Sequence, residues 1–218
     1  ILMNYGGILL TPEFLHGAYK LCRETDTPVL CDEIQSCAWY EGLFLYRRYG
    51  LKPDFLSVGK GFPNGNYPAS RLLFSGAFDC LSQFGALVTN GQEELASLTY
   101  LISMEFMRVN GAHVTEVGNY YHDGELALAK KYPRLIKSVE GDEHMSTLNF
   151  HTVDEAVEFC TRLQKEFCVD ISAQTYKPNC PPAVLTKLPV IVTREMVRIL
   201  LERYERCLSE MEEKANAR

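Results

Sequence analysis

The pattern of apolar and polar positions at the start of the chain predicts a helix. Thr11 and Pro12 are residue types typical of a helix cap and of the first helical turn. Apolar side chains then recur at helical spacing from Phe14 to Leu21. We therefore predict an amphipathic helix that ends near Thr25.

Three short apolar runs follow this helix and indicate strands, at residues 28–31, 54–60 and 69–74. The interval between the first two contains the sequence "YEGLFLYRRYG", which predicts helix, and it is long enough for the crossover that a parallel pair requires. We therefore predict an α/β arrangement with a mostly parallel sheet and helices.

The second half of the chain has a different pattern. A long helix is predicted at residues 92–109 and another at 113–131, with Asn110-Gly111 as the break between them. Beyond Tyr132-Pro133 the sequence predicts a small α+β domain. Its expected elements are strands at 134–140, 146–152, 169–176 and 184–192 and helices at 153–167 and 194–213. We place a domain boundary near residue 130, which gives domains at 1–130 and 131–218.

The composition changes this picture only by excluding some partners. The 218 residues are 46% hydrophobic, which is enough for a packed core. The net charge of −6 comes without a basic cluster, so neither nucleic acid nor an anionic membrane is an expected partner. The sequence has no apolar run of the roughly 18 residues that span a bilayer and no signal-peptide pattern at its start. We expect a soluble cytoplasmic protein that binds small molecules or proteins.

The cysteines and histidines do not predict a metal site. The sequence has eight cysteines, but none forms a C-x-x-C motif and none has a histidine at ligand spacing. We interpret the cysteines as free thiols in a reducing compartment.

Two strand ends carry the candidate chemistry. Asp32 and Lys60 each come just after an apolar run, at the edge where open α/β sheets bind ligands. Lys60 lies between Gly59 and Gly61, and a lysine in a partly desolvated site can form an imine with a carbonyl group. A solvated surface lysine and a helix-capping aspartate explain the same residues, so these positions alone do not decide the function.

Three segments together resemble a known family. The stretches "PVLCDEIQS", "LKPDFLSVGKGFPNGNYPAS" and "GALVTNGQEELASL", in this order, resemble the class III aminotransferases of fold type I, which use pyridoxal 5′-phosphate (PLP). The resemblance implies part of the PLP-binding large domain followed by a small C-terminal domain. It also implies that Lys60 forms the internal aldimine, Asp32 pairs with the pyridine nitrogen, Ile34 packs on the ring and Gln35 reaches the 3-oxygen. Thr89 would bind the phosphate of the neighbouring subunit, which implies a homodimer.

The sequence departs from the family pattern in three places. The family often has a glycine soon after Asp-Glu-x-Gln, whereas Ser36-Cys37-Ala38-Trp39 follows here. The chain opens with "ILMNYGGILLTPEFL", which resembles the segment just before the Asp-Glu-x-Gln strand, so we expect a C-terminal portion without the N-terminal half. The family's carboxylate-binding arginine has no clear match, and Lys187 stands at about its place. We interpret Lys187 as a surface or strand-edge residue.

Three functions stay open at this point. The resemblance implies an aminotransferase that moves an amino group between an amino donor and a keto acid or aldehyde. Another PLP enzyme of the same fold, such as a racemase, decarboxylase or lyase, would use the same Asp32 and Lys60. A noncatalytic flavodoxin-like binding module or a cofactor-free relic is the third hypothesis.

Overall fold

The computed structural model describes most of the chain, namely residues 2–3, 6–65, 67–85, 93–175 and 179–216. Contacts between residues divide the chain into two compact units. Unit 1 is formed by residues 10–112, and unit 2 combines residues 2–9 with residues 113–218. The domain boundary near residue 130 stays a prediction.

Unit 1 begins with helix α1 (Pro12–Glu24), which confirms the predicted first helix. The Thr11 hydroxyl caps it by accepting a hydrogen bond from the Phe14 backbone N–H at 3.3 Å. No residue of α1 is buried, and Phe14 and Leu21 are each 61% exposed. Part of the apolar stripe of α1 is therefore exposed, whereas Leu15 and Tyr19 are half-buried and the helix contacts residues 45–49.

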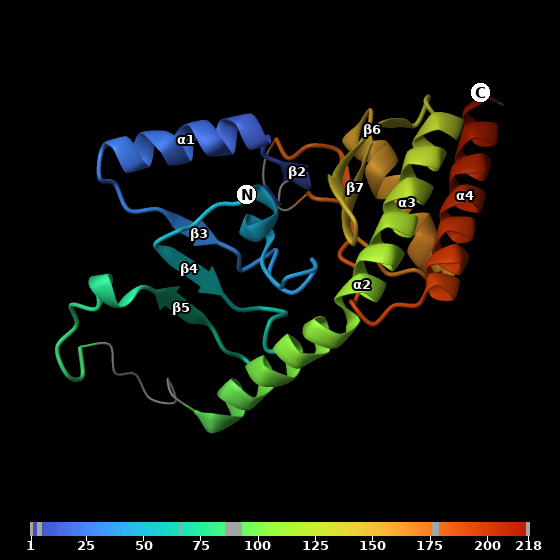
Figure 1. Cartoon of the computed structure of the whole chain (residues 1–218). Coiled ribbons are helices and arrows are strands. Elements are labelled where there is room, and N and C mark those ends of the chain that lie inside the picture. Colours follow the sequence, from blue (N-terminus) through green and yellow to red (C-terminus); the bar gives the residue numbers. More distant parts are fainter. Residues whose placement is uncertain (1, 4–5, 66, 86–92, 176–178, 217–218) are drawn as a thin grey trace. The chain divides into compact units, whose positions relative to one another are not determined.

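A three-stranded sheet forms the centre of unit 1 (Figure 1). Its strands, in spatial order, are β3 (Leu30–Asp32), β4 (Phe55–Val58) and β5 (Arg71–Phe74). Strands β3 and β4 run parallel, with Asp32 beside Ser57, as the crossover length predicted. The crossover itself contains only a short 3-10 helix, η1 (Leu45–Tyr49).

The prediction of a mostly parallel sheet is wrong for the sheets described here. Strands β4 and β5 are antiparallel, with Val58 opposite Arg71. The connection contains no helix in its described residues, 59–65 and 67–70, and it reverses the chain instead of crossing over to the start of the sheet. The three-stranded sheet of unit 2 is antiparallel throughout.

The predicted break at Asn110-Gly111 is also wrong. Helix α2 (Glu94–Lys131) passes through it without interruption. The Asn110 side chain donates to the Phe106 carbonyl within the helix at 2.9 Å. Gly111 is buried, and a Cβ there would lie 3.4 Å from Glu41 Cγ. Tertiary packing on this small residue outweighs its low helix propensity.

Unit 2 is an α+β assembly, as predicted. Its sheet has the order β6 (Ile136–Asp142), β7 (Met145–Phe150) and β8 (Ala183–Leu185), and its helices are the second part of α2, α3 (Val153–Phe167) and α4 (Arg194–Asn216). The short strands β1 (Leu2–Met3) and β2 (Ile8–Leu9) pair with each other, and β2 contacts β6. The strand predicted at 169–176 is absent over its described residues, 169–175.

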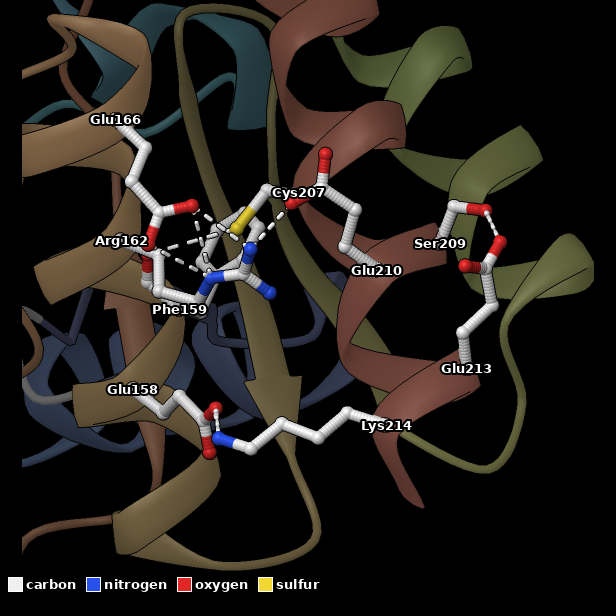
Figure 2. A network of polar contacts seen from close by, with 9 residues as sticks. All are labelled: Glu158, Phe159, Arg162, Glu166, Cys207, Ser209, Glu210, Glu213 and Lys214. Carbon is white, nitrogen blue, oxygen red and sulfur yellow. Dashed lines mark hydrogen bonds and ion pairs between the residues drawn. The ribbon is translucent and has the colours of Figure 1, made fainter. Parts of the chain in front are cut away.

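Helices α3 and α4 are joined by both apolar and ionic contacts. A Thr152–Glu155 capping box begins α3. Figure 2 shows the contacts between the two helices: Arg162 bridges Glu166, at 2.8 Å, and Glu210, while Lys214 pairs with Glu158 at 2.8 Å. The core beneath them includes Tyr121, Phe150, Phe159, Leu163, Tyr204 and Leu208.

The described residues contain no helix that is both long and apolar enough to cross a membrane. All eight cysteines are free, as predicted. No cluster of three or more metal-ligating side chains occurs in the described part of the chain.

Candidate functional site

Asp32 ends β3 at the carboxyl edge of the sheet, where its side chain is exposed. Its Oδ1 atom accepts a hydrogen bond of 2.5 Å from the Ser57 hydroxyl and one of 3.0 Å from the Ile34 backbone N–H. Both bonds use the same oxygen, so no described residue occupies Oδ2. The neighbouring strand thus orients the carboxylate and leaves one oxygen available for a ligand.

Glu33, the next residue, has a structural function that sequence reasoning missed. It is only 1% exposed. Its carboxylate accepts hydrogen bonds from the Tyr46 N–H at 2.6 Å, the Leu45 N–H at 2.9 Å and the Ser36 hydroxyl at 2.9 Å. Burial raises the pKa of Glu33, and these bonds oppose the shift. Glu33 therefore fixes the start of η1 to the end of β3.

The segment after Glu33 packs against the glycines that flank Lys60. The Cys37 thiol donates to the Gly59 carbonyl at 3.8 Å, and burial raises the pKa of this thiol to about 11, so it stays protonated. A Cβ on Gly61 would lie 3.0 Å from the Trp39 ring. The indole therefore lies directly on the backbone of the Lys60 turn, and a larger residue than Gly61 would require the ring to shift.

Lys60 lies in the turn just beyond β4 with an exposed side chain. Its φ angle of 49° is in the left-handed region, which side chains with a Cβ rarely adopt. Backbone strain of this kind clusters at functional sites. A Cβ on Gly59 would lie 3.4 Å from Ile34 Cδ1, so the Ile34 side chain lies beside the residue that precedes Lys60.

The structure brings three of the predicted residues to one sheet edge. Asp32 ends β3, Lys60 lies two residues beyond its parallel neighbour β4, and Ile34 packs against the Lys60 turn. Gln35 is half-buried next to them and has an interaction partner of its own. Thr89 lies outside the described residues.

Lys187, considered as a carboxylate anchor, belongs to unit 2. It follows β8, is half-buried and has an interaction partner. It lines a hollow of about 360 Å³ that also contains Asp170 and Thr186. Only its position in the sequence suggested Lys187 as a carboxylate anchor.

This geometry permits chemistry on a carbonyl group. An exposed primary amine can condense with an aldehyde, and a carboxylate held at the same sheet edge can pair with a cationic nitrogen of the bound molecule. Ser57 supports this carboxylate and Glu33 supports the segment after it. Glu33 stands in the Asp-Glu-x-Gln pattern, but the pattern predicted no function for Glu33 or for Ser57. Only the strand register reveals Ser57, since it places this residue beside Asp32.

Comparison with known proteins gives a family and a fold. The sequence profile of the family described as "Aminotransferase class-III" matches residues 1–208. An acetylornithine aminotransferase of Caldanaerobacter subterraneus subsp. tengcongensis is 25% identical over 191 residues, which are 86% of this chain and 48% of that protein.

Solved structures show the same fold. The ornithine aminotransferase of Toxoplasma gondii ME49 matches with a TM-score of 0.86 at 20% identity, over 98% of this chain and 51% of that one. Another structure of the Toxoplasma gondii enzyme has a TM-score of 0.83 at 19% identity, over 98% of this chain and 50% of that one, and has partial occupancy of PLP at its active site. This chain thus has the α/β fold of aminotransferases over part of their length, and it spans about half the length of the relatives it matches.

Proposed function

Because this chain belongs to the class-III aminotransferase family, we propose that the complete protein moves an amino group between an amino donor and a keto acid or aldehyde. The family uses PLP. One observation carries the proposal: Asp32 ends one strand and Lys60 lies two residues beyond the end of its parallel neighbour in the same sheet. An acid and an amine are the two groups that PLP chemistry requires of the protein.

The residues at this edge fit PLP. Asp32 has an oxygen that no described residue occupies, and it can accept a hydrogen bond from the protonated pyridine nitrogen. The Ile34 side chain, beside the Lys60 turn, offers an apolar surface for the ring. The exposed Lys60 amine is the type of group that reacts with the carbonyl carbon of PLP. When bound, PLP supplies an electron sink for the carbanion that forms when the substrate loses its α-proton.

Each residue then has a defined task. The Asp32 carboxylate, oriented by Ser57 and by the Ile34 N–H, holds a proton on the pyridine nitrogen. With PLP bound, Lys60 Nζ would hold its carbonyl group, and the free amine would take the proton from the substrate α-carbon. Glu33 keeps the segment after β3 in the position from which Trp39 covers the Lys60 turn.

Two further tasks rest on the family resemblance. We propose that Gln35 contacts the 3-oxygen of the ring. We also propose that Thr89 contacts the cofactor phosphate of a partner subunit, so that the active protein is a homodimer.

Borohydride reduction tests the assignment of Lys60. Reduction of the full-length protein with PLP should fix the cofactor to the peptide that contains Gly59-Lys60-Gly61. The variant Lys60→Ala should lose this label, whereas Lys52→Ala, which removes another exposed lysine, should keep it. Label on a different lysine would refute the assignment.

The reaction type needs a second experiment. An amino donor alone should convert the cofactor stoichiometrically to its pyridoxamine form, which only a transaminase does. Turnover of the amino acid without this conversion would indicate a racemase, decarboxylase or lyase. A protein that gains no absorbance band with PLP would be a noncatalytic relative.

A further inference from the structure

Arg71 opens β5 at the sheet edge where β4 ends. Its antiparallel partner in the register is Val58, two residues before Lys60. The preceding residue, Ser70, has its Cβ 3.2 Å from the position that a Cβ on Gly59 would take. The start of β5 therefore lies directly against the Lys60 turn.

Tyr100 on α2 joins Arg71 at this place within unit 1. The Arg71 guanidinium lies over the Tyr100 ring, with its central carbon 5.5 Å from the ring centroid. The Tyr100 ring in turn lies 4.7 Å from the ring of Phe62, two residues after Lys60. One side of the Lys60 turn is thus flanked by a cation stacked on a phenol.

Both groups have unused hydrogen-bonding capacity. The one hydrogen bond of the Arg71 guanidinium to a described residue runs from Nη1 to the carbonyl of its neighbour Ser70, at 2.9 Å, and no described carboxylate forms an ion pair with it. Tyr100 is 7% exposed, yet its hydroxyl has no partner among the described residues. A buried hydroxyl without a hydrogen-bond partner destabilises the folded state.

The Tyr100 hydroxyl is a buried donor that lacks an acceptor among the described residues. Burial raises the pKa of Tyr100, and the positive charge of Arg71 only partly opposes this shift. The hydroxyl therefore stays protonated at neutral pH. Arginine adds several N–H groups in a planar fork, the geometry that matches the paired oxygens of a carboxylate or phosphate.

We propose that Arg71 and Tyr100 form an oxyanion-binding site beside Lys60, which receives either the carboxylate of the amino substrate or the phosphate of the cofactor. The proposal rests on the proposed function, because the anion belongs to a molecule that reacts at Lys60. This oxyanion site is separate from the Asp32 carboxylate. Side chains alternate along a strand, so Arg71 lies on the opposite face of the sheet from Asp32, which bonds to Ser57.

The test compares Arg71→Ala and Tyr100→Phe in the full-length protein. Tyr100→Phe keeps the ring and removes only the hydroxyl, so it remains informative if Arg71→Ala fails to fold. The matched control is Arg47→Ala, because Arg47 also stacks on an aromatic ring, that of Phe44 at 5.1 Å, and donates to a backbone carbonyl, that of Gly42. PLP affinity is measured by titration, and kcat and KM are measured with L-alanine and with isopropylamine, which lacks a carboxylate.

Two results would support the site and identify its anion. If the anion is the substrate carboxylate, Arg71→Ala should raise KM for L-alanine about tenfold or more and leave isopropylamine and PLP affinity unchanged. If the anion is the cofactor phosphate, Arg71→Ala should lower PLP affinity by a similar factor. The kinetic constants for L-alanine and isopropylamine should then change to the same extent. The proposal would be overturned if KM and PLP affinity stayed within twofold of wild type in both Arg71→Ala and Tyr100→Phe. It would also be overturned if Arg47→Ala changed KM or PLP affinity by as much as Arg71→Ala does.

A binding measurement separates this site from the reaction itself. Inorganic phosphate or acetate should raise the Tm of the cofactor-free wild type and of Arg47→Ala, but not that of Arg71→Ala or Tyr100→Phe. This result would support the oxyanion site even if the protein transaminates nothing. Equal Tm increases in all four proteins would overturn it even if the protein is an aminotransferase.

Discussion

The Tyr46 backbone N–H donates a 2.6 Å hydrogen bond to the Glu33 carboxylate, thirteen positions earlier in the chain. The start of η1 has no side-chain cap of its own, so Glu33 acts as a cap supplied from the end of β3. This bond and the Leu45 bond fasten the loop that carries Trp39 to the strand that carries Asp32.

Glu33→Gln should lower the free energy of unfolding by about 1–3 kcal/mol. The glutamine has a single acceptor oxygen, and its amide nitrogen would face backbone N–H groups that need an acceptor. Urea unfolding of the two proteins measures the difference. Glu24→Gln, which removes only an exposed ion pair with Lys20, should change stability by less than about 0.5 kcal/mol. Equal effects of the two substitutions would contradict the capping function.

The left-handed backbone of Lys60 predicts a difference between glycine and alanine at this position. Both substitutions remove the amine, but only Lys60→Gly removes the Cβ that disfavours a φ of 49°. We expect Lys60→Gly to be more stable than Lys60→Ala by about 1 kcal/mol, although glycine ordinarily destabilises. Chemical denaturation of both variants checks this, and a more stable alanine variant would show that the turn is not strained.

The buried Glu125 predicts a pH-dependent stability. Its Oε1 accepts a 2.5 Å hydrogen bond from Tyr121, and Oε2 has no partner in the described structure. Burial raises the pKa of Glu125 to about 7, against the opposing effect of the Ser146 and Tyr121 hydroxyls. Tyr204 also faces this carboxyl, and His122 bonds to Ser146.

The sign follows from the direction of this shift. The folded state binds the proton more tightly than the unfolded state, so the free energy of unfolding should fall as the pH rises from about 4.5 to about 7. The loss attributable to Glu125 is roughly 3 kcal/mol. Glu125→Gln should remove this part of the pH dependence. Urea midpoints at pH 5 and pH 8 measure it, and an unchanged slope in the variant would exclude Glu125 as its source.

Two helical glycines should respond oppositely to alanine. A Cβ on Gly17 of α1 would have no atom within 4 Å, so Gly17→Ala should stabilise the protein by about 1 kcal/mol through helix propensity. A Cβ on the buried Gly118 of α2 would lie 2.8 Å from Glu143 Cβ and from the His144 ring, so Gly118→Ala should destabilise it. Thermal unfolding distinguishes the two variants. If both substitutions stabilised the protein, the turn at Glu143 would have to move away from the new Cβ at position 118.

Local signals predicted the elements whose partners are close in sequence. The Thr11 cap and the apolar spacing of α1 mark a helix boundary that tertiary contacts do not move. The crossover length predicted the parallel pairing that places Asp32 and Lys60 at one edge.

Features that depend on tertiary contacts could not be predicted from the sequence. The direction of β5 depends on how the turn-rich connection reverses, and Gly111 stays helical because Glu41 packs on it. The stacking of Arg71 on Tyr100 joins residues 29 positions apart, and neither belongs to a motif. Such pairs carry no local pattern, so only the folded chain reveals them.

Residues 2–9 belong to the same unit as residues 113–218, and a Cβ on Gly141 would lie 3.1 Å from the Gly7 carbonyl oxygen. Unit 1 is therefore, in sequence, an insertion of about 100 residues within unit 2. If this insertion were unfolded, joining its two ends would cost about 4 kcal/mol of chain entropy. A folded unit 1 already holds its ends at a fixed separation and removes most of that cost, so the two units should fold cooperatively.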